Sequence, residues 1–152
     1  MRISIGCDHG GFNLKQQVVK YLQEKYEVVD YGCQSLESCD YPVFAKKVAN
    51  DVATKTSDFG VLICTTGIGM SITANKFKGV RAALVMNEES AHLTRMHNNS
   101  NVICMGAKFT PYEEAIKYLD AFLNEQFEYS QLGQKSRRRA LWYGLIVRMD
   151  WI

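Results

Sequence analysis

The sequence predicts an α/β domain built on a five-stranded, mostly parallel sheet. Short β-type runs alternate with helix-type stretches along most of the chain, as expected of βα units. One run, FGVLIC, is almost wholly apolar, which is typical of a strand that helices cover on both faces. The expected strands are Arg2–Gly6, Tyr26–Tyr31, Phe59–Cys64, Val80–Met86 and Asn101–Met105.

The first half of the chain should supply two helices. Apolar residues within Phe12–Lys25 recur at nearly helical spacing, which favours a helix after the first strand. Residues 32–40 are polar and should form a loop. A second helix is expected over residues 41–55, because Pro42 suits a first helical turn.

The second half continues the alternation after the apolar strand. A glycine-rich turn, Thr65–Gly69, leads into a short helix expected over Met70–Lys76. Another helix is expected over Asn87–His97, with Asn87 as its N-cap and two glutamates in its first turn. The last helix should start near Thr110 and Pro111 and continue to about residue 124.

The chain has the length of a single domain, which we assign to residues 1–152. The pattern changes after residue 125. Residues 131–139 are polar and basic, whereas residues 140–152 are strongly apolar. We therefore expect residues 125–152 to pack on the domain itself or on a partner subunit.

Composition excludes several classes of protein. Hydrophobic residues make up 47% and charged residues 22% of the chain, which is typical of a soluble globular domain. No apolar run approaches the roughly 20 residues of a membrane helix, and we expect no signal peptide and no membrane partner. The net charge of +2 favours no nucleic-acid partner. Five cysteines without a CxxC pair indicate free thiols in the cytoplasm, and three histidines at these positions favour no metal site.

One cluster, residues 135–139 (KSRRR), departs from this even charge distribution. Two interpretations are open, a solvated face of the tail and a site for an anion such as a phosphate.

Ligands of open parallel sheets bind beyond the carboxyl ends of the strands. That edge should gather Asp8 and His9, Tyr41 at the start of the second helix, Cys64 and the loop after it, and Lys108. The loop matches neither GxxxxGK[ST] nor GxGxxG, so a nucleotide cofactor has no direct support. Its N–H groups could instead hold an oxyanion, and a thiol beside a helix start should have a lowered pKa.

Each of these residues also has a purely structural interpretation. Cys64 could be a small core residue, Asp8 a helix cap and His9 a solvated turn residue. His97 closes a polar stretch that either caps a helix or binds sugar hydroxyls. The other four cysteines are interpreted as structural.

Five segments together resemble the ribose-5-phosphate isomerase B family: GCDHGGFNLK, DYP, LICTTGIGMSITANK, GVRAALV and LTRMHNNSNVICMGAK. The resemblance covers roughly residues 1–128, and the wider group includes isomerases of allose and galactose phosphates. It implies a Rossmann-like three-layer α/β/α sandwich without metal or organic cofactor. It also implies a homodimer, or a tetramer, whose active sites lie at the subunit interface.

The resemblance also implies roles for individual residues. Cys64 matches the base that moves a proton between C1 and C2, and Thr66 matches a hydroxyl in the loop that holds the enediolate. His97 matches the residue that opens the sugar ring, from the partner subunit, with Asn98 beside it. The other implied substrate-binding residues are Asp8, His9, Tyr41, Thr65, Gly67, Ile68, Gly69 and Lys108, together with the phosphate-binding candidates Lys135, Arg137 and Arg138.

The expected function is therefore the interconversion of D-ribose 5-phosphate and D-ribulose 5-phosphate in the non-oxidative pentose phosphate pathway. The chain differs from the family pattern at Thr65, which replaces a usual glycine, and at Lys108, which replaces a frequent arginine. The arginine-bearing segment that the family has after the last helix also differs, since it reads YSQLGQK over residues 129–135. Two alternatives stay open. One is an isomerase of a 6-phosphate aldohexose such as allose or galactose 6-phosphate, and the other is a non-catalytic sugar-phosphate-binding subunit.

Overall fold

Five parallel strands form the central layer of the protein, which a computed structural model describes over residues 1–128. The strand order is β2-β1-β3-β5-β4, and every neighbouring pair is parallel. The strands are β1 (Arg2–Cys7), β2 (Glu27–Asp30), β3 (Phe59–Cys64), β4 (Ala82–Leu84) and β5 (Val102–Gly106). The predicted five-stranded sheet is confirmed, and it is wholly rather than mostly parallel.

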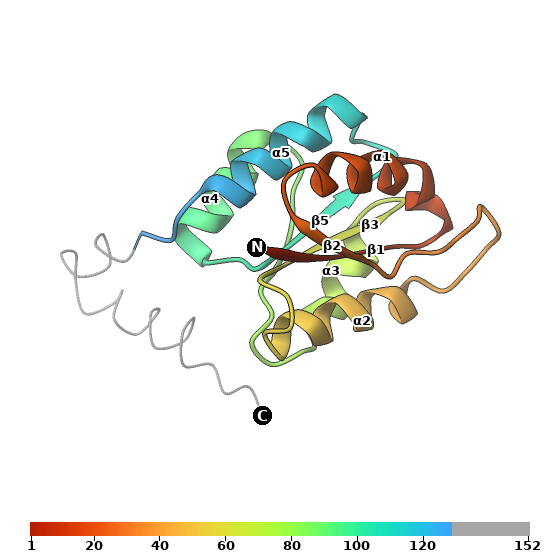
Figure 1. The fold of residues 1–152 in the computed structure, drawn as a ribbon, viewed down its shortest axis with the longest axis horizontal. Coiled ribbons are helices and arrows are strands. Elements are labelled where there is room, and N and C mark those ends of the chain that lie inside the picture. The colour runs from red at the N-terminus through yellow and green to blue at the C-terminus, as the bar shows by residue number, and fades with distance from the viewer. Residues whose placement is uncertain (129–152) are drawn as a thin grey trace.

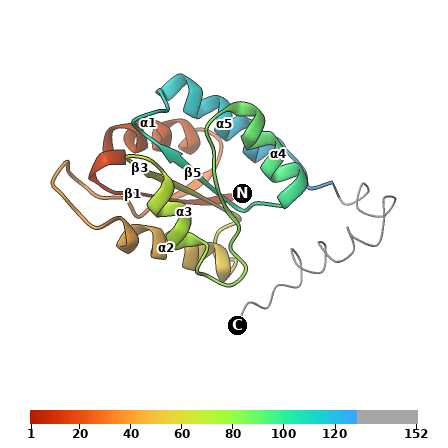
Figure 2. The same ribbon diagram turned by 180° about the vertical axis from the view of Figure 1, so that it is seen from behind.

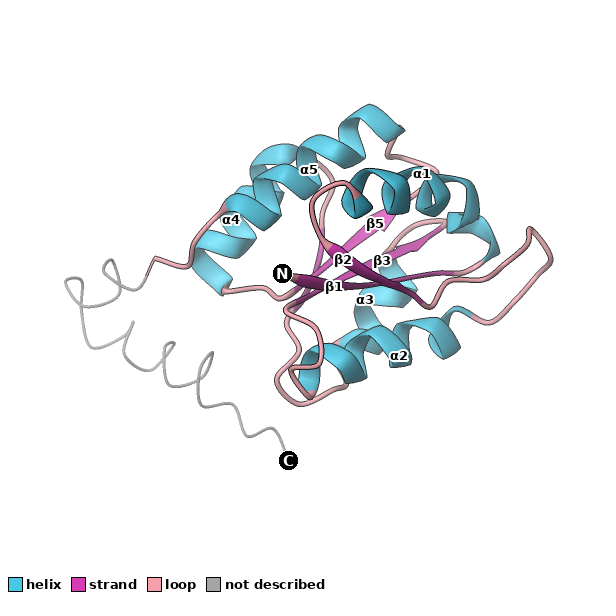
Figure 3. Ribbon diagram, viewed as in Figure 1, coloured by secondary structure: helices cyan, strands magenta, loops and turns pink. Residues whose placement is uncertain are grey.

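Helices cover both faces of this sheet, as Figures 1 and 2 show from opposite sides. One layer holds α1, α4 and α5, and the other holds α2 and α3 (Figure 3). The helices are α1 (Phe12–Gln23), α2 (Tyr41–Ala53), α3 (Ile68–Ala74), α4 (Glu88–Asn98) and α5 (Tyr112–Asn124), and a short 3₁₀ turn over His9–Gly11 precedes α1. The predicted three-layer α/β/α sandwich is therefore confirmed. Among residues 1–128, no helix is long and apolar enough to cross a membrane.

The central strand β3 divides its side chains between the two layers. Val61 and Ile63 belong to the core beneath α1 and α5, whereas Leu62 and Cys64 belong to the core beneath α2 and α3. All four side chains are buried, which explains why the sequence of this strand shows no polar alternation. Cys64 thus ends β3 on the side of the sheet that α2 and α3 cover.

Several predicted element bounds differ from the structure by one or two residues, among them those of α3 and β4. The short helix α3 begins at Ile68 rather than at Met70, because Gly67 adopts a left-handed conformation (φ +76°) and serves as the N-cap. Strand β4 is shorter than predicted. Its expected first residue, Val80, lies in a turn, where its N–H donates to the Phe77 carbonyl at 3.1 Å.

The predicted cap of α4 is confirmed. The Asn87 Oδ1 atom accepts the Ser90 N–H at 2.7 Å, and the Ser90 hydroxyl interacts with the Asn87 backbone in return. This reciprocal cap satisfies N–H groups that the first helical turn leaves free. From this cap α4 runs back along the sheet, toward the edge where the strands begin.

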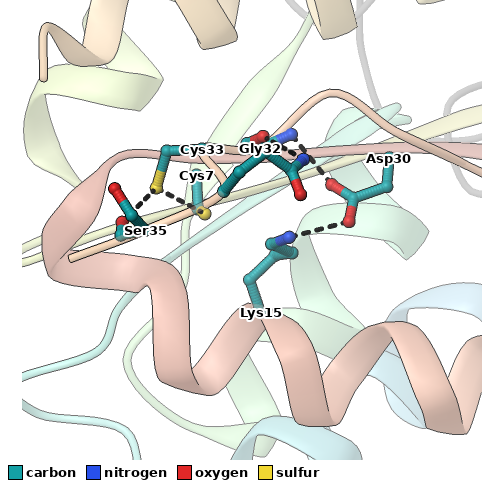
Figure 4. Close-up of polar contacts among 7 residues, drawn as sticks. Cys7, Lys15, Asp30, Gly32, Cys33 and Ser35 are labelled. Atoms are coloured by element: carbon teal, nitrogen blue, oxygen red, sulfur yellow. Dashed lines mark hydrogen bonds and ion pairs between the residues drawn. The ribbon is translucent and has the colours of Figure 1, made fainter. Parts of the chain in front are cut away.

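A buried ion pair joins α1 to the end of β2 (Figure 4). The Lys15 side chain is fully buried, and its Nζ atom lies 2.7 Å from Asp30 Oδ2. The second oxygen of Asp30 accepts the Gly32 N–H at 2.8 Å. The Asp30 side chain is 27% exposed and keeps contact with water, whereas the Lys15 side chain does not. The ion pair therefore stabilises the charge of Lys15 more than that of Asp30.

Replacing Asp30 with alanine should therefore destabilise the protein by about 3–5 kcal/mol, because it leaves a buried ammonium group without its counter-charge. Lys15→Met is the matched control, because it removes the buried charge and keeps a side chain of similar length. We expect the free energy of unfolding of that variant to stay within about 1 kcal/mol of the parent value. Urea unfolding of both variants measures the difference, and equal losses would contradict this account.

Candidate active site

Cys64 lies where β3 ends and the loop to α3 begins. Its side chain is 4% exposed, and its Sγ atom accepts the Gly67 N–H at 3.1 Å. An N–H group that donates to sulfur stabilises the anionic form of a thiol. Gly67 reaches this position only in its left-handed conformation, where a side chain would also come within 2.9 Å of the Met105 carbonyl carbon. The loop therefore holds an N–H group against the Cys64 thiol.

Backbone hydrogen bonds fix this loop to the end of β5. The Ala107 N–H donates to the Cys64 carbonyl at 2.9 Å, and the Lys108 N–H donates to the Thr65 carbonyl at 3.1 Å. The backbone of Thr66 lies against Gly106, where any larger residue would collide with it. The loops after β3 and β5 consequently form one rigid unit, as a preorganised site requires.

Tyr41 and Thr66 lie on the rim of this unit. The Tyr41 ring, at the start of α2, rests on Gly69, since a Cβ atom there would lie 2.7 Å from the ring. The Thr66 hydroxyl accepts the Ile68 N–H at 3.4 Å. The structure therefore brings Cys64, Tyr41 and all the predicted residues of the loop together at one edge of the sheet.

Asp8 and His9 follow β1 at the same edge. The Asp8 side chain is buried and accepts the Gly11 N–H at 3.1 Å, so Asp8 caps the 3₁₀ turn over His9–Gly11, whereas the N-cap of the first α-helix, α1, is Gly11. The His9 Nδ1 atom accepts the Cys39 N–H at 3.2 Å, so the His9 ring is oriented by the loop before α2. With Nδ1 as the acceptor, the proton of a neutral His9 ring is on Nε2, which remains available as a donor.

Three of the other four cysteines have raised pKa values, which disfavours the thiolate that proton transfer needs. The Cys7 and Cys33 sulfurs lie 3.7 Å apart (Figure 4), and burial, followed by the neighbouring Cys33, raises the pKa of Cys7. Burial also raises the pKa of Cys104, as does its neighbour Cys64. Cys39 is partly exposed, and its pKa is raised mainly by partial burial. Within the described chain, no group of side chains is arranged to hold a metal ion.

Thr65 and Lys108 line a separate cavity of about 430 Å³ at this edge. Gly10, Gln17 and Tyr112 also line it, whereas Cys64, His9 and Tyr41 do not. Lys108 is exposed, so its ammonium group is free to approach a ligand in solvent. The structure thus places Lys108 at the predicted edge of the sheet, on a cavity that Cys64 does not line.

His97 and Asn98 do not reach this site within one chain. They end α4, and the next residue, Asn99, is hydrogen-bonded to Arg81, which immediately precedes β4. The Arg95 guanidinium group lies 5.1 Å from the ring of Phe59, the first residue of β3. Because β3 spans about 17 Å from Phe59 to Cys64, the His97 segment lies at the opposite edge of the sheet from the thiol. Both side chains are exposed there.

The three remaining site predictions, Lys135, Arg137 and Arg138, lie outside the described residues, as does most of the tail predicted over residues 125–152. One contact at the site was missed by sequence reasoning, the hydrogen bond from Cys39 to His9. A cysteine in a polar loop gives no signal of it, because the donor is a backbone N–H group. Gly106 was also not singled out as a site residue, although its position directly after an apolar run could have indicated a close backbone approach.

Comparison with known proteins shows the family of the chain. The sequence pattern of the family described as Ribose/Galactose Isomerase matches residues 3–140. The chain is 46% identical to the ribose-5-phosphate isomerase B of Escherichia coli (strain K12) over 128 residues, which cover 84% of this chain and 86% of that relative.

Solved structures give the same result. The ribose-5-phosphate isomerase B of Clostridium thermocellum superimposes with a TM-score of 0.87 at 39% identity, covering 99% of this chain and 97% of that one. The enzyme of Mycoplasma genitalium with bound ribulose-5-phosphate gives a TM-score of 0.85 at 39% identity, covering 97% and 94%.

Proposed function

The chain belongs to the ribose/galactose isomerase family, and from this membership we propose that its site interconverts D-ribose 5-phosphate and D-ribulose 5-phosphate. The observation that carries the proposal is the Cys64 thiol at the end of β3, with the Gly67 N–H held 3.1 Å from its sulfur. The three relatives compared above, all named for this activity, are 39–46% identical to the chain over the aligned residues. The reaction belongs to the non-oxidative pentose phosphate pathway.

The reaction needs a base, a ring-opening group and donors for an enediolate. In the proposed mechanism His97 takes the proton of the O1 hydroxyl and returns a proton to the ring oxygen, which exposes the aldehyde. The Cys64 thiolate then takes the proton from C2 and delivers it to C1, while a proton passes from O2 to O1. N–H groups of the loop from Thr65 to Gly69 hold the negative charge of the enediolate between these steps. The redox change is internal, so the balance needs no cofactor.

The opposite placement of Cys64 and His97 supports a site shared between two subunits. A homodimer, alone or within a tetramer, would bring His97 of the partner subunit to the Cys64 loop. Large apolar side chains on α2 and α3 support this assembly. Val43, Ile68 and Ile72 are each at least 50% exposed on the layer that flanks Cys64. The five cysteines are all free, as expected in the cytoplasm, where we place the enzyme.

An assay of the purified protein with ribose 5-phosphate tests the proposed function. We expect turnover of ribose 5-phosphate with a higher kcat/KM than of allose 6-phosphate or galactose 6-phosphate. The reverse order would make the chain a hexose-phosphate isomerase of the same family. No turnover of any of the three by a folded dimer would make it a non-catalytic subunit.

Lys108 is proposed to hold the phosphate. We expect Lys108→Ala to raise KM for ribose 5-phosphate about tenfold or more and to change kcat little, because the phosphate is bound alike in the ground and transition states. Lys108→Arg should keep or improve the KM, since a guanidinium group binds phosphate bidentately.

Lys20→Ala is the matched control for that variant, because Lys20 is an exposed lysine in the last turn of α1. Its KM should equal that of the parent protein. A KM that is unchanged in a folded Lys108→Ala protein would show that the phosphate binds elsewhere.

A further inference from the structure

Two arginines from different segments converge on the turn that follows α4. The Arg95 Nη1 atom donates to Asn99 Oδ1 at 2.7 Å and to the Ser100 carbonyl at 3.0 Å. The Arg81 Nε atom donates to the Asn99 carbonyl at 2.8 Å. The side-chain and main-chain oxygens of Asn99 are thus each held by a different guanidinium group.

The backbone of this turn is fixed as well. Asn99 adopts a left-handed conformation (φ +50°), which asparagine tolerates better than most residues. Ser100 is buried, and its hydroxyl lies 2.6 Å from that of Thr94, six residues earlier in α4. Asn101 accepts the Arg81 N–H at 2.8 Å through its Oδ1 atom. Residues 99–101 are therefore each hydrogen-bonded to α4 or to Arg81, the residue before β4.

This arrangement brings two cations close together. Burial lowers the pKa of both arginines, and the charge of Arg81 lowers that of Arg95 further. Arg95 is also packed against the rings of Phe59 and Phe122, at 5.1 Å and 6.0 Å from their centres. The two hydrogen bonds that the Arg95 side chain donates are both accepted by the turn after α4. These bonds explain why an arginine occupies this position although the charge of Arg81 repels it.

We propose that Arg81, Arg95 and Asn99 are positioning residues, which hold the end of α4 so that His97 and Asn98 project correctly toward the site of the partner subunit. The proposal rests on the proposed function, in which His97 opens the sugar ring. His97 and Asn98 are exposed, while the residues directly after them are fixed. Small displacements of a reacting group reduce rates strongly, so a fixed turn at this place has a direct effect on ring opening.

The experiment compares two reactions that differ in their need for ring opening. Ribose 5-phosphate is mainly cyclic, whereas ribulose 5-phosphate cannot close a five-membered ring because its O5 atom carries the phosphate. Loss of the C1 proton signal of ribulose 5-phosphate in D₂O therefore reports enolisation alone. For Arg81→Gln we expect a fall on the order of tenfold or more in kcat for ribose 5-phosphate, with C1 proton loss within about twofold of the parent.

Three further variants complete the test. Asn99→Gly keeps the left-handed backbone and the carbonyl group that Arg81 binds, but it removes the Oδ1 atom that accepts from Arg95. It should therefore show the same split between the two reactions. Arg81→Lys should recover part of the kcat. Lys55→Gln removes another cation that lines the same 460 Å³ cavity as Arg81 and Arg95, and it should change neither reaction.

The outcomes separate this proposal from the proposed function when His97→Ala is measured in parallel. If His97→Ala lowers ribose 5-phosphate turnover but Arg81→Gln and Asn99→Gly do not, the positioning role is overturned and the function stands. Equal losses of both reactions in these two variants would show a merely structural role and also overturn it. If His97→Ala turns over ribose 5-phosphate normally, the assignment of ring opening to His97 fails, and the positioning role fails with it.

Discussion

The Cys64→Ala protein is expected to lose at least about a hundredfold in kcat for ribose 5-phosphate, with only a modest change in KM. The thiolate acts on the C2 proton in the transition state and contributes little to binding of the ground state. Alanine also removes the acceptor of the Gly67 N–H group without adding bulk to a buried position. Loss of the C1 proton of ribulose 5-phosphate in D₂O should fall as strongly, because enolisation needs the same base.

Cys104→Ala is the matched control for this loss. Cys104 is fully buried on β5 and lies near enough to Cys64 for that neighbour to raise the pKa of Cys104. Because both cysteines are buried, removal of either sulfur creates a comparable cavity. We expect the kcat of Cys104→Ala to stay within about twofold of the parent. A Cys64→Ala enzyme with near-normal kcat would refute the assignment of the base. Inactivation by iodoacetamide, with protection by substrate, independently tests whether the Cys64 thiol is needed for activity.

The His97→Ala protein is expected to show the second-largest effect, and a different one. Turnover of ribose 5-phosphate should fall by about a hundredfold, since the acid–base group that opens the ring is gone. Enolisation of the open-chain ribulose 5-phosphate should continue, because Cys64 and its loop are intact. Parallel measurements on the two sugar phosphates check this split, and an equal fall in both would assign His97 to the enolisation step instead.

A mixture of the two inactive proteins tests where His97 acts. In a hybrid dimer one site would combine an intact Cys64 loop with an intact His97 of the partner subunit. Activity should therefore return when Cys64→Ala and His97→Ala subunits are mixed and exchanged. No recovery after demonstrated subunit exchange would contradict a shared site.

The fold could be predicted closely where local sequence decides it. The predicted bounds of β3 agree with the structure at both ends, because polar residues on either side of an apolar run mark where the strand begins and ends. The cap at Asn87 was also readable, since capping depends on residues three positions apart. The start of α3 was placed two residues late, because a glycine can either continue a loop or cap a helix, and the choice at Gly67 depends on contact with β5.

The site was predictable in its residue types but not in all of its geometry. Strand ends could be located from the sequence, and they gather Cys64, Asp8 and Lys108 at one edge. The cavity that Lys108 lines is bordered by α1 and by the start of α5, whereas Cys64 belongs to the core beneath α2 and α3, and this side of the sheet could not be assigned to Lys108 from the sequence. The contact of Asn99 with Arg81 was not predictable, because it joins the residue before one strand to the end of a helix 18 residues later.

The direction of α4 has a consequence for how the enzyme behaves in dilute solution. Within one chain, the length of the central strand β3 lies between His97 and the Cys64 loop. An isolated subunit therefore holds one part of each of two different sites, and neither site is complete. Ring opening would then obey mass action between subunits. Below the dissociation constant of the dimer, turnover of ribose 5-phosphate should fall with the square of the protein concentration, while enolisation of ribulose 5-phosphate should fall only in proportion to it.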